Sequence, residues 1–139
     1  MRYLIDTNIF IFIATEPMSL TRDVYALISD PDVELCMSSV SVKELLVAYR
    51  HKGFNIRRWK TPEDMVNSIE DDYCITVLPV GMSDMKVYSR LKINEREGHN
   101  DPNDHVIISQ ALNVCLPLIS SDHKFKFYKK QGLDLIYNE

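Results

Sequence analysis

Arg2-Tyr3-Leu4-Ile5-Asp6-Thr7-Asn8 joins a short apolar run directly to three polar residues. A run of about four to eight residues bounded by turn-forming residues is typical of a buried strand, because a buried helix needs a longer apolar segment. Four more short runs have the same character and predict strands at residues 33–37, 75–78, 118–120 and 133–136. The sequence therefore predicts a sheet of about five buried strands.

Longer segments between these runs repeat apolar residues every three or four positions, the period of a helix packed on one face. One such helix opens at Thr61, which is placed as N-cap with Pro62 in the first turn. The other helices are predicted at residues 20–29, 40–49, 83–94 and 104–115. Helices that alternate with strands predict a three-layer α/β/α sandwich around a mainly parallel sheet. We expect residues 1–139 to form a single domain.

The composition is that of an ordinary globular protein. Hydrophobic residues make up 45% of the chain and charged residues 26%, which excludes collagen-like, low-complexity and disordered classes. Sixteen Lys and Arg against twenty Asp and Glu give a net charge of −4. This balance argues against a nucleic-acid binder that relies on bulk positive charge. It leaves room for an enzyme whose acids gather in a site that recruits cations.

Cysteine usage and hydropathy indicate the compartment. Cys36, Cys74 and Cys115 are odd in number, far apart and set among apolar neighbours, so we expect buried free thiols in a reducing cytosol. The apolar run at residues 9–14 is far shorter than the roughly 20 residues that span a bilayer. No basic segment or small-residue cleavage site precedes it. We therefore expect a cytoplasmic protein that has no membrane partner.

Acidic residues lie where the predicted strands end. Asp6 directly follows the first predicted strand, and Asp122 comes shortly after the fourth. If the sheet is parallel, both lie at the carboxyl edge, where open α/β sheets bind ligands. Glu44 belongs to the helix after the second strand and flanks its apolar stripe. These three carboxylates are therefore expected close together.

Two further acids open the helix predicted at residues 104–115. Asp104 shares a face with Ile108 and Ala111, where a carboxylate must be paired, cap the helix or bind a metal. Asp101 is placed to cap this helix, with Pro102 at its first position. The side chains of Asp101 and Asp104 would then lie one turn apart.

The convergence of these acids predicts a cation site. A single Asp at a strand end or helix start is most often a cap, but four or five at one edge are much less expected. No Lys or Arg lies within helical reach of Asp6 or Asp104, so their mutual repulsion favours a bound cation. Oxygen ligands favour Mg²⁺ or Mn²⁺, which can polarise a phosphate and activate water.

Four acidic stretches stand in order along the chain: Leu4-Ile5-Asp6-Thr7-Asn8, Ser38-Ser39-Val40-Ser41-Val42-Lys43-Glu44-Leu45, Asp101-Pro102-Asn103-Asp104-His105-Val106-Ile107-Ile108-Ser109-Gln110-Ala111 and Leu118-Ile119-Ser120-Ser121-Asp122. Together they resemble the four motifs of PIN-domain ribonucleases over essentially the whole chain, and the resemblance is closest to VapC-type toxins of bacterial toxin–antitoxin pairs. It implies a PIN-like fold and a Mg²⁺- or Mn²⁺-dependent endoribonuclease acting on RNA. Such toxins are commonly homodimers held inactive by a small antitoxin.

The resemblance also implies which residues act. The acids that would bind the metal and support catalysis are Asp6, Glu44, Asp104 and Asp122, with Asp101 as an additional metal-binding acid. Asn8 and Ser120 match polar residues that orient water and carboxylates. Two positions depart from the family's pattern, because an aromatic residue is frequent where Asn103 stands and an arginine where His105 stands.

Two other functions remain open at this stage. A first strand followed by Asp6-Thr7-Asn8 also resembles haloacid-dehalogenase-type phosphatases, which use a nucleophilic Asp and a second Asp two residues later. Here that second residue is Asn8, and Glu44 would have no evident role. The other alternative is a non-catalytic binding module whose acids only cap helices. A zinc site is not indicated, because the four histidines show no ligand spacing.

Positive charge available to RNA is local in this acidic chain. Residues 51–60 form a basic segment with aromatic residues and include Arg57 and Arg58. Lys124 begins a second basic group immediately after Asp122. These three side chains are candidate phosphate contacts, with a solvated surface as the alternative.

Overall fold

The computed structural model describes residues 1–139 and contains all five predicted strands. They are β1 (Arg2–Ile5), β2 (Glu34–Ser38), β3 (Thr76–Leu78), β4 (Leu118–Ser120) and β5 (Leu135–Tyr137). The sheet order is β3-β2-β1-β4-β5, and every neighbouring pair is parallel. In the centre, Leu4 is opposite both Cys36 and Leu118. The first strand of the chain is thus the middle strand of the sheet.

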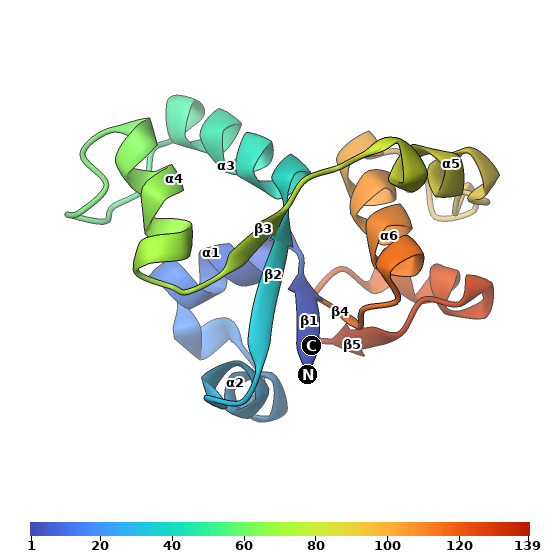
Figure 1. Cartoon of the computed structure of the whole chain (residues 1–139), viewed down its shortest axis with the longest axis horizontal. Helices are drawn as coiled ribbons and strands as arrows, with labels where there is room; N and C mark the ends of the chain where they lie inside the picture. The colour runs from blue at the N-terminus through green and yellow to red at the C-terminus, as the bar shows by residue number, and fades with distance from the viewer.

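Helices follow or precede each strand and cover both faces of the sheet (Figure 1). The α-helices are α1 (Thr7–Thr15), α2 (Arg22–Ser29), α3 (Ser39–His51), α4 (Pro62–Asp71), α5 (Met82–Arg90) and α6 (Pro102–Val114). Two 3₁₀ segments, η1 (Pro17–Ser19) and η2 (His123–Gln131), complete the chain. None of these helices combines the length and the apolar composition that crossing a bilayer requires. The predicted three-layer fold is confirmed, and its sheet is entirely parallel.

Successive residues of the strands pack alternately into two separate hydrophobic cores. Ile5, Met37 and Ile119 point to one face, where α1 to α4 pack over them. Leu4, Cys36 and Leu118 point to the other face, against α6 and η2. Because successive side chains of a strand point to opposite faces, short runs that are apolar at every position serve both cores.

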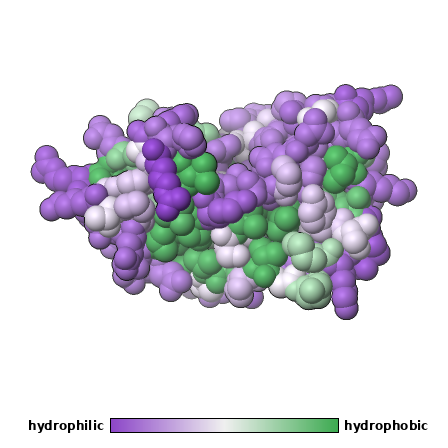
Figure 2. Space-filling view, turned by 90° about the horizontal axis from the view of Figure 1, so that it is seen from above, coloured by the Kyte–Doolittle hydropathy of each residue, from purple (hydrophilic) through white to green (hydrophobic).

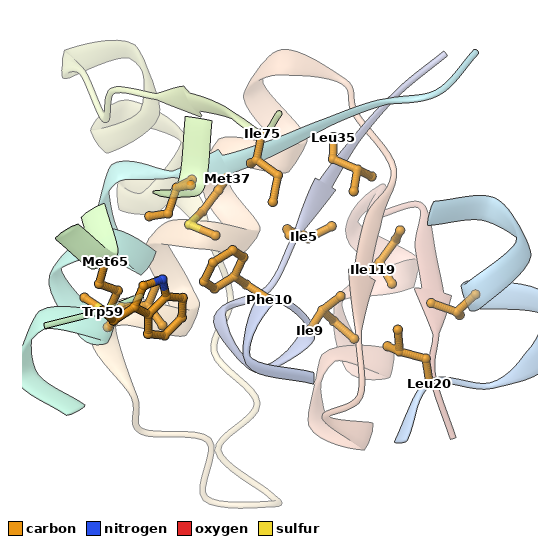
Figure 3. Close-up of a cluster of buried hydrophobic side chains, with 13 residues drawn as sticks. Ile5, Ile9, Phe10, Leu20, Leu35, Met37, Trp59, Met65, Ile75 and Ile119 are labelled. Atoms are coloured by element: carbon orange, nitrogen blue, oxygen red, sulfur yellow. The ribbon is translucent and has the colours of Figure 1, made fainter. Parts of the chain in front are cut away.

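Helix α1 is not predicted by the periodicity of the sequence. Residues 9–14 are apolar at every position, so no polar face marks a helix. In the structure Ile9 and Phe10 are fully buried, and Asp6 caps the helix through its side chain. The aromatic rings of Phe10 and Trp59 stack with centroids 6.2 Å apart (Figure 3). Helix α1 is therefore stabilised by tertiary packing, which sequence periodicity does not report.

Helix α5 is shorter than the segment predicted at residues 83–94, because it ends at Arg90. Beyond it, the backbone N–H of Lys92 donates to Gln131 Oε1 at 3.0 Å, and the Lys92 carbonyl accepts from Gln131 Nε2 at 2.9 Å. Asn94 is buried, and its side chain donates to the backbone carbonyl of Lys124 at 3.3 Å. Polar side chains thus replace the hydrogen bonds that a longer helix would make.

The prediction of three buried thiols is wrong for two of them. All three cysteines are free, but only Cys36 is buried. Cys74 follows α4 and Cys115 is the C-cap of α6, with φ of 54° and 56° respectively. Left-handed backbone turns the chain away at a helix end, and both side chains are exposed there. Apolar neighbours in the sequence therefore did not ensure burial.

We predict that Phe10→Ala lowers the free energy of unfolding by about 3–5 kcal/mol, because it removes a fully buried ring next to Trp59 and Tyr73. Urea denaturation in the presence of a chelator measures the loss. The matched control is Phe12→Ala on the same helix, where the ring is only partly buried and the loss should be smaller. Equal losses for the two variants would contradict the packing described here.

Candidate metal centre

The carboxyl ends of β1 and β4 lie side by side at one edge of the sheet, and five acidic side chains converge there. Figure 2 looks onto this edge from above, and hydrophilic residues cover much of it. A pocket of about 360 Å³ is lined by Asp6, Thr7, Asn8, Ile11, Glu44, Ala48, Asp101, Asp104 and Asp122. Every acid that the sequence placed at this edge is therefore part of one pocket.

Asp6 is the most buried of these acids, with 4% of its surface exposed. Its Oδ1 accepts the backbone N–H of Thr7 at 2.8 Å, which caps α1. Its Oδ2 accepts the hydroxyl of Ser120 at 2.8 Å, from the neighbouring strand β4. Burial, reinforced by the negative charge of Asp104, raises the pKa of Asp6 to about 7. The carboxylate is thus fixed in orientation but unfavourable as a charge.

The start of α6 has the predicted arrangement. Asp101 is the N-cap and accepts the backbone N–H of Asn103 at 2.9 Å, with Pro102 in the first turn. Asp104 lies one turn further on, and its Oδ2 is 3.1 Å from Nε2 of His99. Burial raises the pKa of Asp104 to about 7, and the charge of Asp101 is the next largest cause.

Glu44 and Asp122 complete the acidic lining. Glu44 Oε1 accepts the hydroxyl of Thr7 at 2.6 Å, and that hydroxyl also lies 2.8 Å from the Ser41 oxygen. Burial raises the pKa of Glu44. Asp122 Oδ1 accepts the backbone N–H of Lys124 at 2.9 Å, which caps η2. Each carboxylate of the pocket is therefore held by at least one hydrogen bond from the protein.

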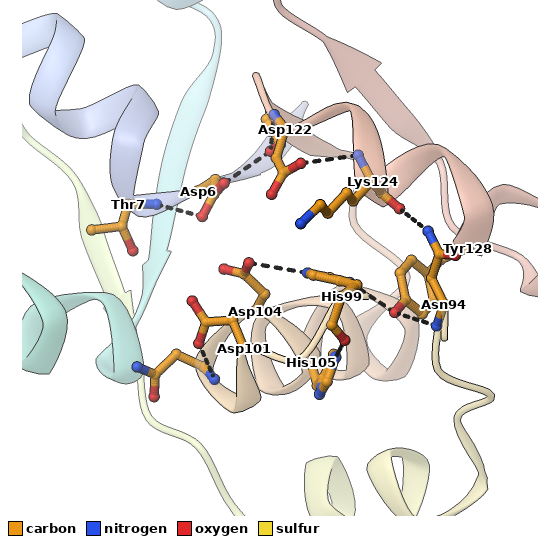
Figure 4. A network of polar contacts seen from close by, with 12 residues as sticks. Asp6, Thr7, Asn94, His99, Asp101, Asp104, His105, Asp122, Lys124 and Tyr128 are labelled. Atoms are coloured by element: carbon orange, nitrogen blue, oxygen red, sulfur yellow. Dashed lines mark hydrogen bonds and ion pairs between the residues drawn. The ribbon is translucent and has the colours of Figure 1, made fainter. Parts of the chain in front are cut away.

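A positive charge reaches Asp104 from another element of the fold. The side chain of Lys124, from the start of η2, extends toward Asp104 and His99 (Figure 4). Its charge lowers the pKa of Asp104, against the larger effect of burial. The expectation of no cation within helical reach holds, yet the tertiary fold supplies one.

The donor atoms fit a divalent cation. One oxygen from each of Glu44, Asp101 and Asp104 lies within 4.8 Å of the others. A second group joins Nε2 or Nδ1 of His99 to oxygens of Asp104 and Asp122 within the same limit. A set made mainly of carboxylate oxygens suits hard cations such as Mg²⁺ and Mn²⁺. Asp104 belongs to both groups and so lies at the middle of the candidate centre.

The remaining predicted residues lie in different places. Asn8 lines the pocket and is exposed, whereas Ser120 is fully buried behind Asp6. Arg57 and Arg58 are exposed in the loop after α3, and Arg58 pairs with Asp72 at 3.1 Å. Figure 1 shows this loop beyond the far end of α3, away from the ends of β1 and β4. These two arginines are therefore not part of the pocket.

Some residues of the site carry no signal that sequence reasoning detected. His99 precedes the α6 motif in a loop, and its contact with Asp104 depends on how that loop folds. Thr7 lies inside the first motif, and its position next to Asp6 is the sequence feature that could have indicated a role in the site. The two departures from the family pattern have partners of their own. Asn103 Oδ1 accepts from Lys43 Nζ at 2.7 Å, and His105 Nε2 contacts the His99 carbonyl at 2.8 Å.

Comparison with known proteins places this geometry among characterised folds. The chain matches the PIN domain family over residues 3–131. No curated protein sequence matches the chain. The fold is similar to a chain of VapBC2 from Rickettsia felis bound to a DNA fragment from its promoter, with a TM-score of 0.72, 17% identity and 100% coverage of both chains.

Two other solved structures show the same fold. A chain of VapBC-1 from nontypeable Haemophilus influenzae gives a TM-score of 0.68 at 23% identity, covering 99% of this chain and 98% of that one. A chain of VapBC-5 from Mycobacterium tuberculosis, from the VapBC family of toxin–antitoxin systems, gives a TM-score of 0.62 at 21% identity with the same coverage. The whole chain thus shares one architecture with these proteins.

Without metal, the folded protein should lose stability as the pH rises from about 6.5 to about 8.5. In this range Asp6 and Asp104 lose protons in the folded state, whereas in the unfolded state they are already ionised. The melting temperature in chelator should fall by at least about 3 °C. Burial lowers the pKa of His99 and His105, so these side chains make the folded protein more stable as the pH rises. This opposite effect acts mainly at lower pH, where the imidazoles of the unfolded chain bind protons.

Two comparisons check that the carboxylates cause this slope. Asp104→Asn should flatten it and raise the melting temperature at the higher pH, whereas Asp71→Asn, an exposed acid at the end of α4, should leave it unchanged. Millimolar Mg²⁺ should also raise the melting temperature at the higher pH. A melting temperature that does not fall with pH in chelator would contradict the assignment.

Proposed function

The chain belongs to the PIN-domain family, and we propose that it is a Mg²⁺- or Mn²⁺-dependent endoribonuclease, the toxin of a toxin–antitoxin pair. One observation carries the proposal: five carboxylates from four separate segments line one small pocket at the carboxyl edge of the sheet. Two of them, Asp6 and Asp104, have pKa values raised to about 7, so they are held where their charges are unfavourable. Raised pKa values of this kind are typical of functional sites.

The cation would be held by the carboxylate oxygens of the two groups that share Asp104. Glu44 would bind it from α3, Asp101 from the start of α6 and Asp122 from the segment that follows β4. When bound, such an ion polarises a phosphodiester and makes a water molecule more acidic. A carboxylate set of this charge suits phosphodiester hydrolysis, in which negative charge develops on the phosphate oxygens.

The protein's own side chains would orient these groups. Thr7 and Ser120 each donate a hydrogen bond to a pocket carboxylate, so Glu44 and Asp6 are fixed before any ligand arrives. Preorganised ligands lose little freedom on binding, which favours catalysis. Lys124 extends into the same site, where its ammonium group would contact a phosphate next to the cleaved bond (Figure 4).

The partners follow from the same proposal. The solved VapBC structures contain toxin–antitoxin complexes, and by analogy we propose a small antitoxin as partner and a homodimer as the working assembly. An antitoxin Arg or Lys entering the acidic pocket would compete with the metal for the same carboxylates. The phosphatase alternative is not retained, because it gives no role to Glu44, which lines the same pocket as Asp6, and because the family match covers residues 3–131.

The enzyme hypothesis predicts that Asp104→Asn and Asp6→Asn each lower RNA cleavage by at least about 100-fold, because each removes a negative charge needed to hold and use the metal. Asp71→Asn makes the same chemical change on the exposed end of α4 and should cleave like the wild type. Gel assays with single-stranded RNA in Mn²⁺, in Mg²⁺ and in excess chelator measure the rates. Equal cleavage in excess chelator would contradict the metal dependence, whereas no cleavage by any form would favour the non-catalytic binding module.

The basic residues predict how RNA binding depends on salt. Lys124→Ala should weaken binding without moving the cleavage site, and it should reduce the slope of log K against log salt by about 0.7. Arg57→Ala combined with Arg58→Ala should matter only for RNA long enough to pass beyond α3, because this loop lies away from the pocket. Fluorescence anisotropy at several salt concentrations, with short and long RNA, measures both. Unchanged slopes would mean that these side chains are only solvated.

A further inference from the structure

A chain of buried hydrogen bonds runs behind Asp104 and connects three segments of the protein (Figure 4). The backbone N–H of Asn94 donates to the Tyr128 hydroxyl at 3.1 Å. That hydroxyl lies 2.8 Å from Nδ1 of His99, and Nε2 of His99 lies 3.1 Å from Oδ2 of Asp104. The side chains of His99 and Tyr128 are buried, with 2% and 0% of their surfaces exposed. The chain thus reaches from η2 to a carboxylate of the pocket.

The direction of these bonds fixes the role of each group. A backbone N–H only donates, so the Tyr128 oxygen accepts from Asn94. Its own hydrogen is then available for Nδ1 of His99, the polar atom 2.8 Å away. A neutral imidazole that accepts at Nδ1 carries its proton on Nε2 and donates there. Every member of the chain is satisfied when Nε2–H of His99 donates to Asp104.

The imidazole is also held by its surroundings. Its ring packs against Phe125 and Tyr128, with centroids 5.5 Å apart in both cases. The backbone carbonyl of His99 contacts Nε2 of His105 at 2.8 Å, which fixes the loop just before α6. Asn94 binds the Lys124 carbonyl as well, so the same loop also holds the segment that supplies Asp122 and Lys124.

We propose that His99 is a positioning residue for the metal centre: it occupies Oδ2 of Asp104 and leaves the other carboxylate oxygen for the cation. That other oxygen, Oδ1, accepts no hydrogen bond from the protein. Hydrogen bonds to a ligating carboxylate commonly fix its orientation and strengthen metal binding by 10–100-fold. The inference rests on the proposed function, because it assumes that Asp104 binds a divalent cation.

The alternative role for His99 is direct ligation, since its nitrogen belongs to the second group of possible ligand atoms. The hydrogen-bond chain argues against it, because a protonated Nε2 cannot donate a lone pair to a metal. Direct coordination through Nε2 would require the imidazole to lose its hydrogen bond to Asp104 and to move its proton away from Nε2. The two roles are separated by whether a nitrogen nucleus couples to a bound paramagnetic ion.

The test measures Mn²⁺ dissociation constants by electron paramagnetic resonance for the full chain and its variants. His99→Leu should weaken Mn²⁺ binding by about 10–100-fold, because Asp104 loses its donor. His99→Gln should recover most of the affinity, since its amide can donate from a similar position. Tyr128→Phe, which removes only the hydroxyl that orients the imidazole, should give an intermediate loss. His51→Leu, on the exposed end of α3, is the matched control and should bind like the wild type.

Several results would overturn the proposal. These are wild-type affinity in His99→Leu, a His99→Gln variant no better than His99→Leu, or a directly bound ¹⁴N signal from wild-type protein in spin-echo spectra of Mn²⁺. Thermal unfolding in chelator shows whether each variant is folded, and if His99→Leu is not, wild-type affinity in Tyr128→Phe overturns the proposal. Failure of the proposed function looks different, because wild-type protein would then bind no Mn²⁺ or cleave no RNA.

Discussion

The carboxylate of Asp6 is buried at the end of the middle strand, and the rest of the site is arranged around it. One oxygen caps α1 and the other accepts the Ser120 hydroxyl from β4, so the same group joins a helix, two strands and the pocket. A buried carboxylate without such partners would cost several kcal/mol. These hydrogen bonds keep Asp6 in place, while burial and the charge of Asp104 raise its pKa and make the ionised form unfavourable.

The clustered carboxylates therefore lower the stability of the fold but create a pocket suited to a cation. Its carboxylates repel one another, and the fold holds them together through donors such as Thr7, His99 and the backbone N–H of Lys124. Two well-packed cores on opposite faces of the sheet provide the stability that this arrangement needs. Strain at a functional site that is compensated elsewhere in the fold is a common pattern in proteins. A bound cation would relieve the repulsion without any change in the fold.

Sequence patterns predicted the sheet and the acids well, because both depend on local features. Short apolar runs bounded by polar residues mark strands, and Asp6 and Asp122 could be placed because each lies within two residues of the end of such a run. Long-range contacts could not be predicted in this way. Helix α1 has no polar face, so its existence depends on packing against Trp59 and the sheet. The contact of His99 with Asp104 depends on a loop whose path is set by Asn94 and η2.

The position of β1 in the middle of the sheet has a consequence for biosynthesis. Ser120, which holds Asp6 from β4, follows it by 114 positions in the chain, and Asp122, which lines the pocket, comes two residues later. At about 5–20 residues per second, translation needs roughly 6–23 s to bridge this interval. Until then β1 lacks one of its two neighbours, and the acidic pocket does not exist. A growing polypeptide, or one terminated before Asp122, consequently lacks the assembled centre, which forms only after β4 and the residues that follow it have been made.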